Sequence, residues 1–333
     1  MEGECARLLD HNADWRGAEG WPRIFLIHCP EVGFSLDDEN SPYYRLKRSL
    51  LEAGVPCQMV DTPTLLDPDF KDLNLALNIV AKCGIAPWVL PESIPDADFF
   101  IGLSYTQSAR LDGARLMGFA NVFNEYGRWE FYSGGTEVFP YEEKAKHYAK
   151  LVEETLGRLA LSEEATICFH YSAKFSREDR VAILNAARRV RPKGTYWFVW
   201  INKTHHVRLY DRRQETDGSL SRGRYVLGSS NQVYLSTTGY NPYRKFLGTP
   251  QMLEINVRIE RPEGIIFGPP DLRVVATQIL SLTKLNWAST DSLCGEPITT
   301  KYAGDIAYLT AAFMRQSGMF RLHPVLERTP WFI

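Results

Sequence analysis

The first ninety residues alternate short apolar runs with apolar stripes at helical spacing. The run at 23–29 (RIFLIHC) predicts a buried strand, and Pro42 suits the first turn of a helix that Gly54 ends. The elements predicted after the first strand are a helix over 43–53, a strand over 58–60 and a helix over 72–83. Because strands alternate with helices, this stretch predicts a parallel α/β unit that forms only part of a domain.

From residue 96 onward the pattern changes to consecutive strands. Three runs at 96–106, 115–127 and 128–135 predict a meander joined by short turns. The elements predicted next are a helix over 141–156, a strand over 166–171, a helix over 177–189, a strand over 195–202, further strands within 225–237 and 253–258, and helices near 272–283 and 301–316. Three antiparallel strands followed by helix, strand, helix and strand is the element order of a ribonuclease-H-like fold.

The composition indicates a folded chain with more than one domain. At 333 residues, with 44% hydrophobic and 23% charged residues, the chain exceeds the usual length of one domain and can bury a full core. This excludes a disordered, collagen-like or low-complexity polymer. The N-terminus lacks the apolar stretch of a signal peptide, and no run of about 18 uninterrupted apolar residues follows it. We therefore predict a cytoplasmic protein that does not enter a membrane.

Cysteine and histidine spacing argues against metal and disulfide chemistry. No C-x-x-C pair and no histidine at ligand spacing accompany the six cysteines, which we expect to be reduced: Cys5, Cys29, Cys57, Cys83, Cys168 and Cys294. The adjacent His205 and His206 would point to opposite faces of a strand, so we do not expect them to share a metal. We interpret His170 as a core strand residue rather than a general base.

The net charge of -2 hides two regions of opposite sign. Residues 1–100 hold 8 Lys and Arg against 17 Asp and Glu, whereas residues 174–225 hold 13 against 5. The aromatic residues interleaved with this basic stretch are Tyr196, Trp197, Trp200 and Tyr210. Two interpretations stay open: a solvated helix face with a loop, or a groove that binds phosphates through basic side chains and stacks bases on aromatic rings.

Seven short strings, in order along the chain, give it a family resemblance. They are YYRLK at 43–47, KCGIAPWVL at 82–90, FFIGLSY at 99–105, HYSAK at 170–174, KLNW at 284–287, EPITTKYAGDIAYL at 296–309 and the terminal TPWFI. Over roughly residues 23–333, their order and spacing resemble the MID and PIWI domains of short prokaryotic Argonautes. The resemblance implies an α/β chain in which a partial Rossmann-like MID domain precedes a ribonuclease-H-like PIWI domain.

In that family, MID grips the 5′ phosphate of a guide strand, and the resemblance implies the same pocket here. Tyr43 and Lys47 match the family's Y-x-x-x-K, and at i and i+4 they share one helix face. Gln58 matches the glutamine on the next strand, and Lys82 matches the second phosphate lysine. Two ammonium groups, an amide and a phenolic hydroxyl can satisfy the oxygens of one phosphate. For Tyr43 and Lys47 alone, an exposed amphipathic helix face is the competing interpretation.

The resemblance also implies a divalent cation at the guide end. In the family the terminal carboxylate reaches back to this pocket, and here that group belongs to Ile333. A carboxylate oxygen is a hard ligand that suits Mg²⁺ or Mn²⁺. Asn78, one helical turn before Lys82, falls where a relative has an amide ligand. A tail that docks only through its apolar side chains is the alternative.

The positions that carry catalytic carboxylates in target-cleaving Argonautes are not acidic here. Such enzymes use these groups to hold two metal ions for water attack on a phosphodiester. The expected acids fall at Ser104, Ser172 and Gly304, and the adjacent Asp305 would point about 100° away around its helix. A hydroxyl cannot neutralise a metal pair, so we predict that the protein has no catalytic residues of this kind and does not cleave its target.

Two further hypotheses stay open. One is a metal-dependent guided nuclease that uses other carboxylates, such as Asp98, Glu125, Asp179 or Asp305. The other is a heterodimer module that cannot bind a guide alone, because relatives begin MID with an additional βαβ portion and only about 22 residues precede the first strand here.

The predicted domains are an N-terminal extension over 1–22, an incomplete MID-like unit over 23–92 and a PIWI domain over 93–333. The resemblance implies a small guide RNA or DNA and a complementary target strand, which we expect to be DNA. It also implies a role in prokaryotic defence with an effector partner that carries an APAZ region and a TIR, sirtuin-like or nuclease domain.

Overall fold

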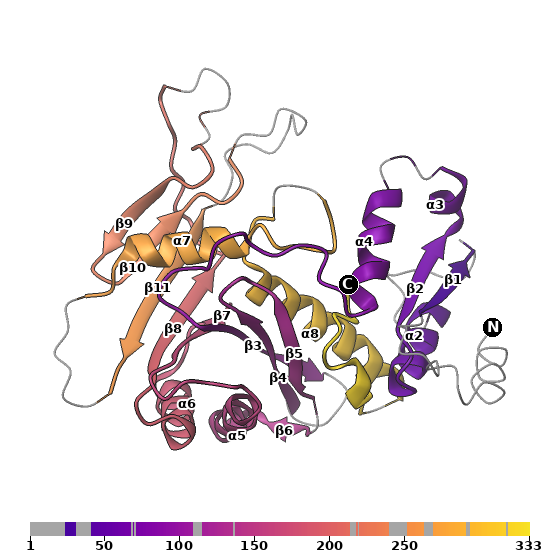
Figure 1. Ribbon diagram of the computed structural model, residues 1–333, viewed down its shortest axis with the longest axis horizontal. Helices are drawn as coiled ribbons and strands as arrows, with labels where there is room; N and C mark the ends of the chain where they lie inside the picture. Colours follow the sequence, from indigo (N-terminus) through magenta and orange to yellow (C-terminus); the bar gives the residue numbers. More distant parts are fainter. Residues whose placement is uncertain are drawn as a thin grey trace.

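A computed structural model describes most of the chain after residue 23. The described residues are 24–30, 41–67, 69, 71–108, 115–135, 137–213, 218, 220–239, 252–262, 269–290, 294–317 and 319–333. The predicted extension over 1–22, Arg23 of the first predicted strand and the loop before Ser41 lie outside them. The described residues form a small α/β unit beside a large sheet with helices on both faces (Figure 1).

The small unit is built around two parallel strands, β1 (Phe25–Cys29) and β2 (Cys57–Asp61). Helix α2 (Pro42–Glu52) lies between them in sequence, with Pro42 in its first turn as predicted. Gly54 follows the helix with a φ of +79°, a conformation that costs glycine little and ends the helix. The apolar face of α2 packs on one side of the strand pair through Leu46, Leu50, Ile27, Cys29, Val55 and Cys57. This confirms the predicted parallel α/β unit.

Two helices follow β2. Helix α4 (Asp72–Lys82) was predicted, although with one residue more at its end. Helix α3 (Thr62–Leu66) was not predicted, because five residues are too short to show a helical period. It starts where the Asp61 side chain accepts a hydrogen bond from the Thr64 backbone N–H, a normal N-cap arrangement.

Within the described residues, nine strands form the large mixed sheet. The first three make the predicted antiparallel meander: β3 (Phe99–Ser108), β4 (Arg115–Asn124) and β5 (Trp129–Gly134). Strands β7 (Thr166–Tyr171) and β8 (Thr195–Asn202) then add in parallel beside β3. The other strands are β6 (Phe139–Pro140), β9 (Tyr225–Ser229), β10 (Gln232–Leu235) and β11 (Leu253–Glu260). The sheet order is β5-β4-β3-β7-β8-β11-β10-β9, with β6 on β4, so the predicted element order is confirmed.

Alternate residues of the strands face two separate cores. On β3, Ile101 and Leu103 face α5 (Lys144–Gly157) and α6 (Arg177–Val190), whereas Phe100 faces the opposite side. That side is covered by α7 (Leu272–Leu282) and α8 (Ile298–Ser317), as Figure 1 shows. Short 3₁₀ turns precede α5 (η1, Tyr141–Glu143) and form part of the C-terminal tail (η2, Pro324–Leu326). The sheet is thus the middle layer of three.

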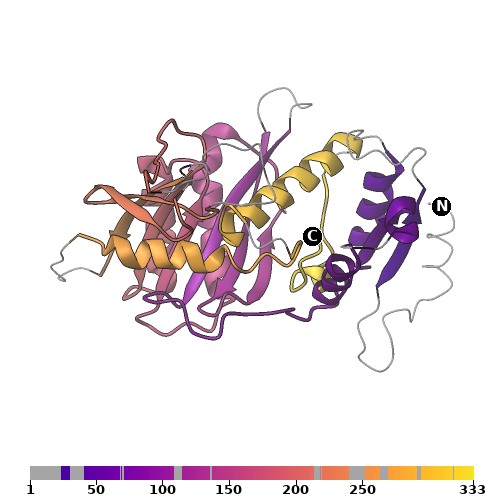
Figure 2. The ribbon, with the colours of Figure 1, turned by 90° about the horizontal axis from the view of Figure 1, so that it is seen from above.

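The small unit docks against α8 and the tail. Arg48 of α2 donates hydrogen bonds to the backbone carbonyls of Phe313 and Met319, at 2.7 and 2.8 Å. Tyr44 and Tyr308 place their hydroxyls 3.2 Å apart across the same boundary. The segment after α4 runs along the molecule to the start of β3 (Figure 2). Among the described residues, no helix combines the length and the apolar character needed to span a bilayer.

Candidate phosphate-binding site

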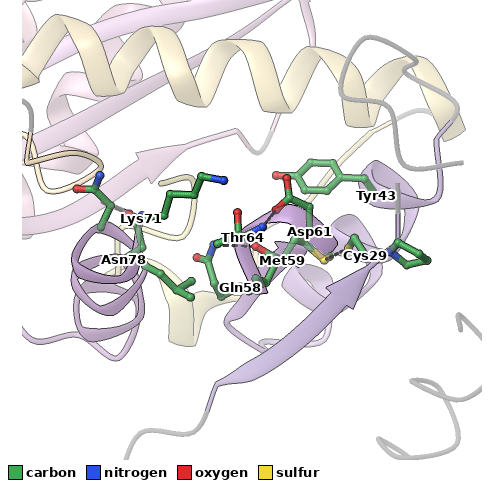
Figure 3. A pocket seen from close by; sticks show the side chains of 12 residues that line it. Cys29, Tyr43, Gln58, Met59, Asp61, Thr64, Lys71 and Asn78 are labelled. Atoms are coloured by element: carbon green, nitrogen blue, oxygen red, sulfur yellow. Dashed lines mark hydrogen bonds between the residues drawn. The ribbon is translucent and has the colours of Figure 1, made fainter. Parts of the chain in front are cut away.

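A cavity of about 470 Å³ opens beside the carboxyl ends of the two parallel strands (Figure 3). In open α/β sheets, ligands bind at this edge. The residues that line the cavity come from β1, β2 and the helices next to them: Cys29, Pro30, Tyr43, Gln58, Met59, Val60, Asp61, Thr64, Lys71, Asn74, Leu75 and Asn78. Three predicted site residues, Tyr43, Gln58 and Asn78, are therefore on its wall.

The two predicted lysines lie behind this wall rather than on it. Lys47 is 3% exposed and Lys82 is 2% exposed, and neither lines the cavity. Lys47 Nζ donates to the Tyr43 hydroxyl at 3.2 Å, and Lys82 Nζ donates to Gln58 Oε1 at 2.6 Å. The structure therefore brings the four predicted residues together as two donor–acceptor pairs at one edge of the cavity.

The buried lysines create an unbalanced positive environment. In the described part of the chain, neither ammonium forms an ion pair with a carboxylate; their partners are a phenol and an amide. Burial, and then the charge of Lys47, lower the pKa of Lys82 well below its ordinary value. Burying cations without an anion is costly, so this arrangement is typical of a site that receives an anion.

Asn78 has an unused ligand atom at the cavity. Its Oδ1 is buried and has no hydrogen-bond partner among the described residues. A carbonyl oxygen in that state fits the role of a hard ligand for a divalent cation. Elsewhere in the described residues, no three His, Cys, Asp or Glu side chains gather into a metal site.

The chain end passes close to α4. Pro330 and Ala81, the residue before Lys82, line a common small cavity of about 150 Å³. Trp331 and Phe332 are buried in the central core, and the half-buried Ile333 packs against it. The docked apolar tail is therefore observed. Within the described residues no hydrogen bond or ion pair joins the Ile333 carboxylate to the pocket, so its role as a metal ligand stays a prediction.

Sequence reasoning missed part of the cavity wall. Lys71, at the N-cap of α4, extends its side chain into the space that Tyr43 and Gln58 also face (Figure 3). A lysine is unfavourable at a helix N-terminus, so its presence at the start of α4 could have indicated a functional role from the sequence. Asn74 is fixed through its Oδ1, which accepts from the Thr290 backbone N–H at 2.7 Å. Interaction with the Thr64 hydroxyl, followed by the hydrogen bond from the Thr64 backbone N–H, lowers the pKa of the Asp61 carboxyl.

Two of the three positions at which the resemblance implies catalytic acids lie on or next to neighbouring strands. Leu103 pairs with Tyr171 in the parallel register of β3 and β7, so Ser104, on β3, lies beside Ser172, which directly follows β7. β7 ends at Tyr171, as predicted, so Ser172 lies just beyond the strand and is exposed. Gly304 lies on the exposed side of α8, where a Cβ would meet no atom within 4 Å.

Three of the alternative carboxylates have structural partners. Asp98 Oδ2 accepts from the Thr166 N–H at 2.7 Å. Asp179 caps α6 with Ser176 and forms a buried ion pair with Lys144 at 2.8 Å. Asp305 pairs with Lys301 at 2.8 Å along α8. Each of these carboxylates thus contacts a residue that stabilises the fold: Thr166 of β7, Lys144 of α5 or Lys301 of α8.

Two of the four aromatic residues in the basic stretch are buried and cannot line a groove. Tyr196 and Trp197 are buried in the two cores on either side of β8, because alternate residues of a central strand face opposite helical layers. The Tyr196 hydroxyl donates to the backbone carbonyls of Ala187 and Arg191. Only Tyr210, at 63% exposure, lies plainly on the surface among the four aromatic residues. Stacking of bases on Tyr196 or Trp197 is excluded.

The histidines behave largely as expected. His170 is fully buried in β7, its Nδ1 lies 2.9 Å from the Thr299 hydroxyl, and burial lowers its pKa to about 3. His205 and His206 do not lie on a strand, because β8 ends at Asn202. His205 Nε2 is 2.6 Å from the Met252 carbonyl, whereas His206 is exposed. The two side chains therefore lie in different environments.

Comparison with known proteins adds a family context. No protein-family model matches the chain. It is 24% identical over 302 residues to the Argonaute protein of Aquifex aeolicus, covering 86% of this chain and 38% of that protein. It is also 24% identical to the Argonaute protein of Cereibacter sphaeroides, covering 82% and 38%. The chain thus spans about two fifths of the length of these curated relatives.

Solved structures agree with the sequence matches. Clostridium butyricum Argonaute bound to a guide DNA and a 19-mer target DNA matches with a TM-score of 0.71 at 20% identity, over 96% of this chain and 41% of that one. Aquifex aeolicus Argonaute with externally bound siRNA matches with a TM-score of 0.66 at 20% identity, over 100% and 44%. These matches show that the chain has the mixed α/β fold of Argonaute MID and PIWI domains.

Proposed function

We propose that the chain holds the 5′-phosphorylated end of a small guide RNA or DNA and pairs the guide with a target strand without cleaving it. The observation that carries this proposal is the pair of buried lysines beside the cavity, to which the described residues supply no carboxylate partner. A terminal phosphate is a dianion near neutral pH and supplies the missing charge.

The site distinguishes a phosphate from a hydroxyl through charge-assisted hydrogen bonds. Lys47 and Lys82 would donate to phosphate oxygens, with Tyr43 and Gln58 at the mouth of the site. A hydrogen bond to a charged group contributes about 1.5–3 kcal/mol, so losing two such bonds weakens binding by about two to four orders of magnitude. Base pairing then selects the target, while the protein recognises the phosphate backbone and the shape of the duplex.

The resident cation proposed for this site is Mg²⁺ or Mn²⁺. Asn78, with its buried and unpartnered Oδ1, and the terminal carboxylate of Ile333 would hold it. When bound, the cation supplies positive charge that neutralises neighbouring guide phosphates. Asn78 is fixed on α4 four residues before Lys82, so the amide oxygen and the ammonium belong to the same helix face.

We propose that the chain lacks target cleavage because Ser104, Ser172 and Gly304 supply no carboxylate. Two metal ions need several anionic ligands, and neither a hydroxyl nor a hydrogen atom provides that charge. On the basis of the resemblance, we further propose a cytoplasmic role in prokaryotic defence. The target would be a complementary DNA strand, and the output would come from an APAZ-containing effector.

Equilibrium binding of guides with 5′-phosphate and 5′-hydroxyl ends tests the pocket. We expect the phosphorylated guide to bind at least tenfold more tightly, as RNA, DNA or both. The double variant Lys47→Met with Lys82→Met should abolish the difference, whereas Lys146→Met, at a highly exposed lysine, should leave it unchanged. Equal affinity of the wild-type protein for the two guide ends would refute the pocket.

A cleavage assay tests the second part of the proposal. With Mg²⁺ or Mn²⁺, a phosphorylated guide and a complementary labelled strand, we expect full-length target to persist. Cut product that disappears in Asp305→Ala would establish a guided nuclease instead. Binding that arises only after co-expression with a neighbouring gene product would establish a heterodimer module.

A further inference from the structure

We propose that Gln58 is a latch on the pocket: its amide holds Lys82 until a guide phosphate displaces it. This inference rests on the proposed function and adds an order of events to it. The Gln58 side chain stands between the cavity and the buried lysine, since Gln58 lines the cavity and Lys82 does not.

Both ends of the Gln58 amide are already used. Its Oε1 accepts from Lys82 Nζ at 2.6 Å, and its Nε2 donates to the Met59 backbone carbonyl at 3.0 Å. One of its two Nε2 hydrogens is used in this way, and the other stays available to a phosphate oxygen. Because Gln58 lines the cavity and Lys82 lies behind it, a phosphate oxygen reaches the Lys82 ammonium only after the Gln58 side chain rotates.

Tyr43 is held more firmly than Gln58. Its ring packs edge-to-face on Tyr44, with ring centroids 5.0 Å apart, and Lys47 lies 5.5 Å from its centre. Tyr44 is itself buried in the central core. Gln58 has no ring packing of this kind in the described residues and sits half-buried on β2. Of the two acceptors that occupy the lysines, Gln58 is therefore the one that moves.

The exchange of acceptors is favourable in free energy. A neutral amide is a weaker partner for an ammonium than a phosphate dianion, because charge-assisted hydrogen bonds are about twice as strong as neutral ones. The lowered pKa of Lys82, which arises from burial and the nearby charge of Lys47, is consistent with an ammonium that lacks adequate compensation while the pocket is empty. Before a guide binds, the Gln58 amide oxygen accepts the hydrogen bond that Lys82 donates.

Association kinetics test the latch with two substitutions of opposite sign. Gln58→Met keeps the side-chain volume but removes the acceptor, so a phosphorylated guide should associate at least about tenfold faster, the factor that corresponds to one charge-assisted hydrogen bond of about 1.5 kcal/mol. Gln58→Glu replaces the amide with a carboxylate that pairs with Lys82, so association should be at least fivefold slower. Stopped-flow fluorescence with a dye-labelled, 5′-phosphorylated guide measures both rates.

Gln58→Met with a 5′-hydroxyl guide is the matched control, because the latch acts only on the terminal phosphate. The gain in association rate should be confined to the phosphorylated guide. If the wild-type protein prefers phosphorylated guides but Gln58→Met associates no faster, the latch is wrong and the pocket stands. If the wild-type protein shows no preference for a phosphate, the proposed function and the latch both fall.

Discussion

Two buried lysines of this chain differ in whether a carboxylate compensates their charge. Lys144 is buried against Asp179, with 2.8 Å between Nζ and Oδ2. Lys82 is also buried, and among the described residues its hydrogen-bond partner is the neutral Gln58 amide. Breaking a buried ion pair leaves an uncompensated charge, whereas removing an isolated buried cation relieves a desolvation cost. The same residue type therefore stabilises the fold in one place and destabilises it in the other.

Stability measurements on Lys144→Met and Lys82→Met should separate these roles. We expect Lys144→Met to lower the free energy of unfolding by about 3–5 kcal/mol, because Asp179 stays buried without its partner. Lys82→Met should raise it. Urea unfolding at pH 7 measures both changes, and a loss of stability in Lys82→Met would contradict this account of the pocket.

The pH dependence of the Lys82→Met gain has a definite sign. The folded-state pKa of Lys82 is lowered, so the unfolded chain binds more protons between that value and the ordinary 10.5. Wild-type stability from this group therefore rises with pH across that window. The advantage of Lys82→Met should be greatest below the lowered pKa and should vanish above about 10.5.

Among the secondary-structure elements, helix α8 depends on two glycines in opposite ways. Gly102 of β3 lies under the start of α8, where a Cβ would collide with the Asn121 Oδ1 and the Thr299 carbonyl oxygen. Gly304 lies on the exposed side of α8, where a Cβ would meet no atom within 4 Å. The first glycine permits close packing of helix on sheet, and the second leaves a flexible residue within a helix.

Alanine substitution should therefore change stability in opposite directions at these glycines. Gly304→Ala should raise the free energy of unfolding by about 0.5–1 kcal/mol, because it removes unfolded-chain entropy at an open helical position. Gly102→Ala should lower it by more than that gain, because Asn121 and the α8 backbone must both shift. Thermal melts of the two variants provide the measurement. A stabilised Gly102→Ala would show that α8 can move away from the sheet freely.

At the scale of the whole molecule, the pocket depends on contacts between the small unit and the large sheet. Arg48 lies one residue after Lys47 on α2 and donates to two carbonyls at the end of α8 and beyond it. Its Nε also donates to Glu52 at 3.1 Å. Arg48 therefore fixes the helix that carries Tyr43 and Lys47 against the layer that carries the tail.

Arg48→Met should weaken this docking. Two buried carbonyls would lose charged donors, so we expect the free energy of unfolding to fall by about 2–4 kcal/mol. Lys146→Met, at a highly exposed position on α5, is the control and should change stability by less than about 0.5 kcal/mol. Chemical denaturation of both variants checks the difference, and equal effects would mean that Arg48 does not hold the units together.

Much of the fold followed from local pattern. The meander, the order of helices and strands, and the end of α2 at Gly54 were all visible as apolar periods and turn residues, because each is encoded by neighbours in sequence. The i, i+4 pairing of Tyr43 with Lys47 was predictable for the same reason. The serines and the glycine at the three acid positions could be read directly from the sequence.

Only the tertiary structure decided which polar groups are buried and what they face. Lys82 and Gln58 are 24 positions apart, and their contact exists because α4 packs on β2. Tyr196 and Trp197 looked like surface aromatics in a basic stretch, but β8 is a central strand with helices on both faces. The sequence by itself determined the elements and the chemical groups available, since these depend on local periods and residue types. The burial of the two lysines depends on contacts between distant segments, which no local pattern encodes.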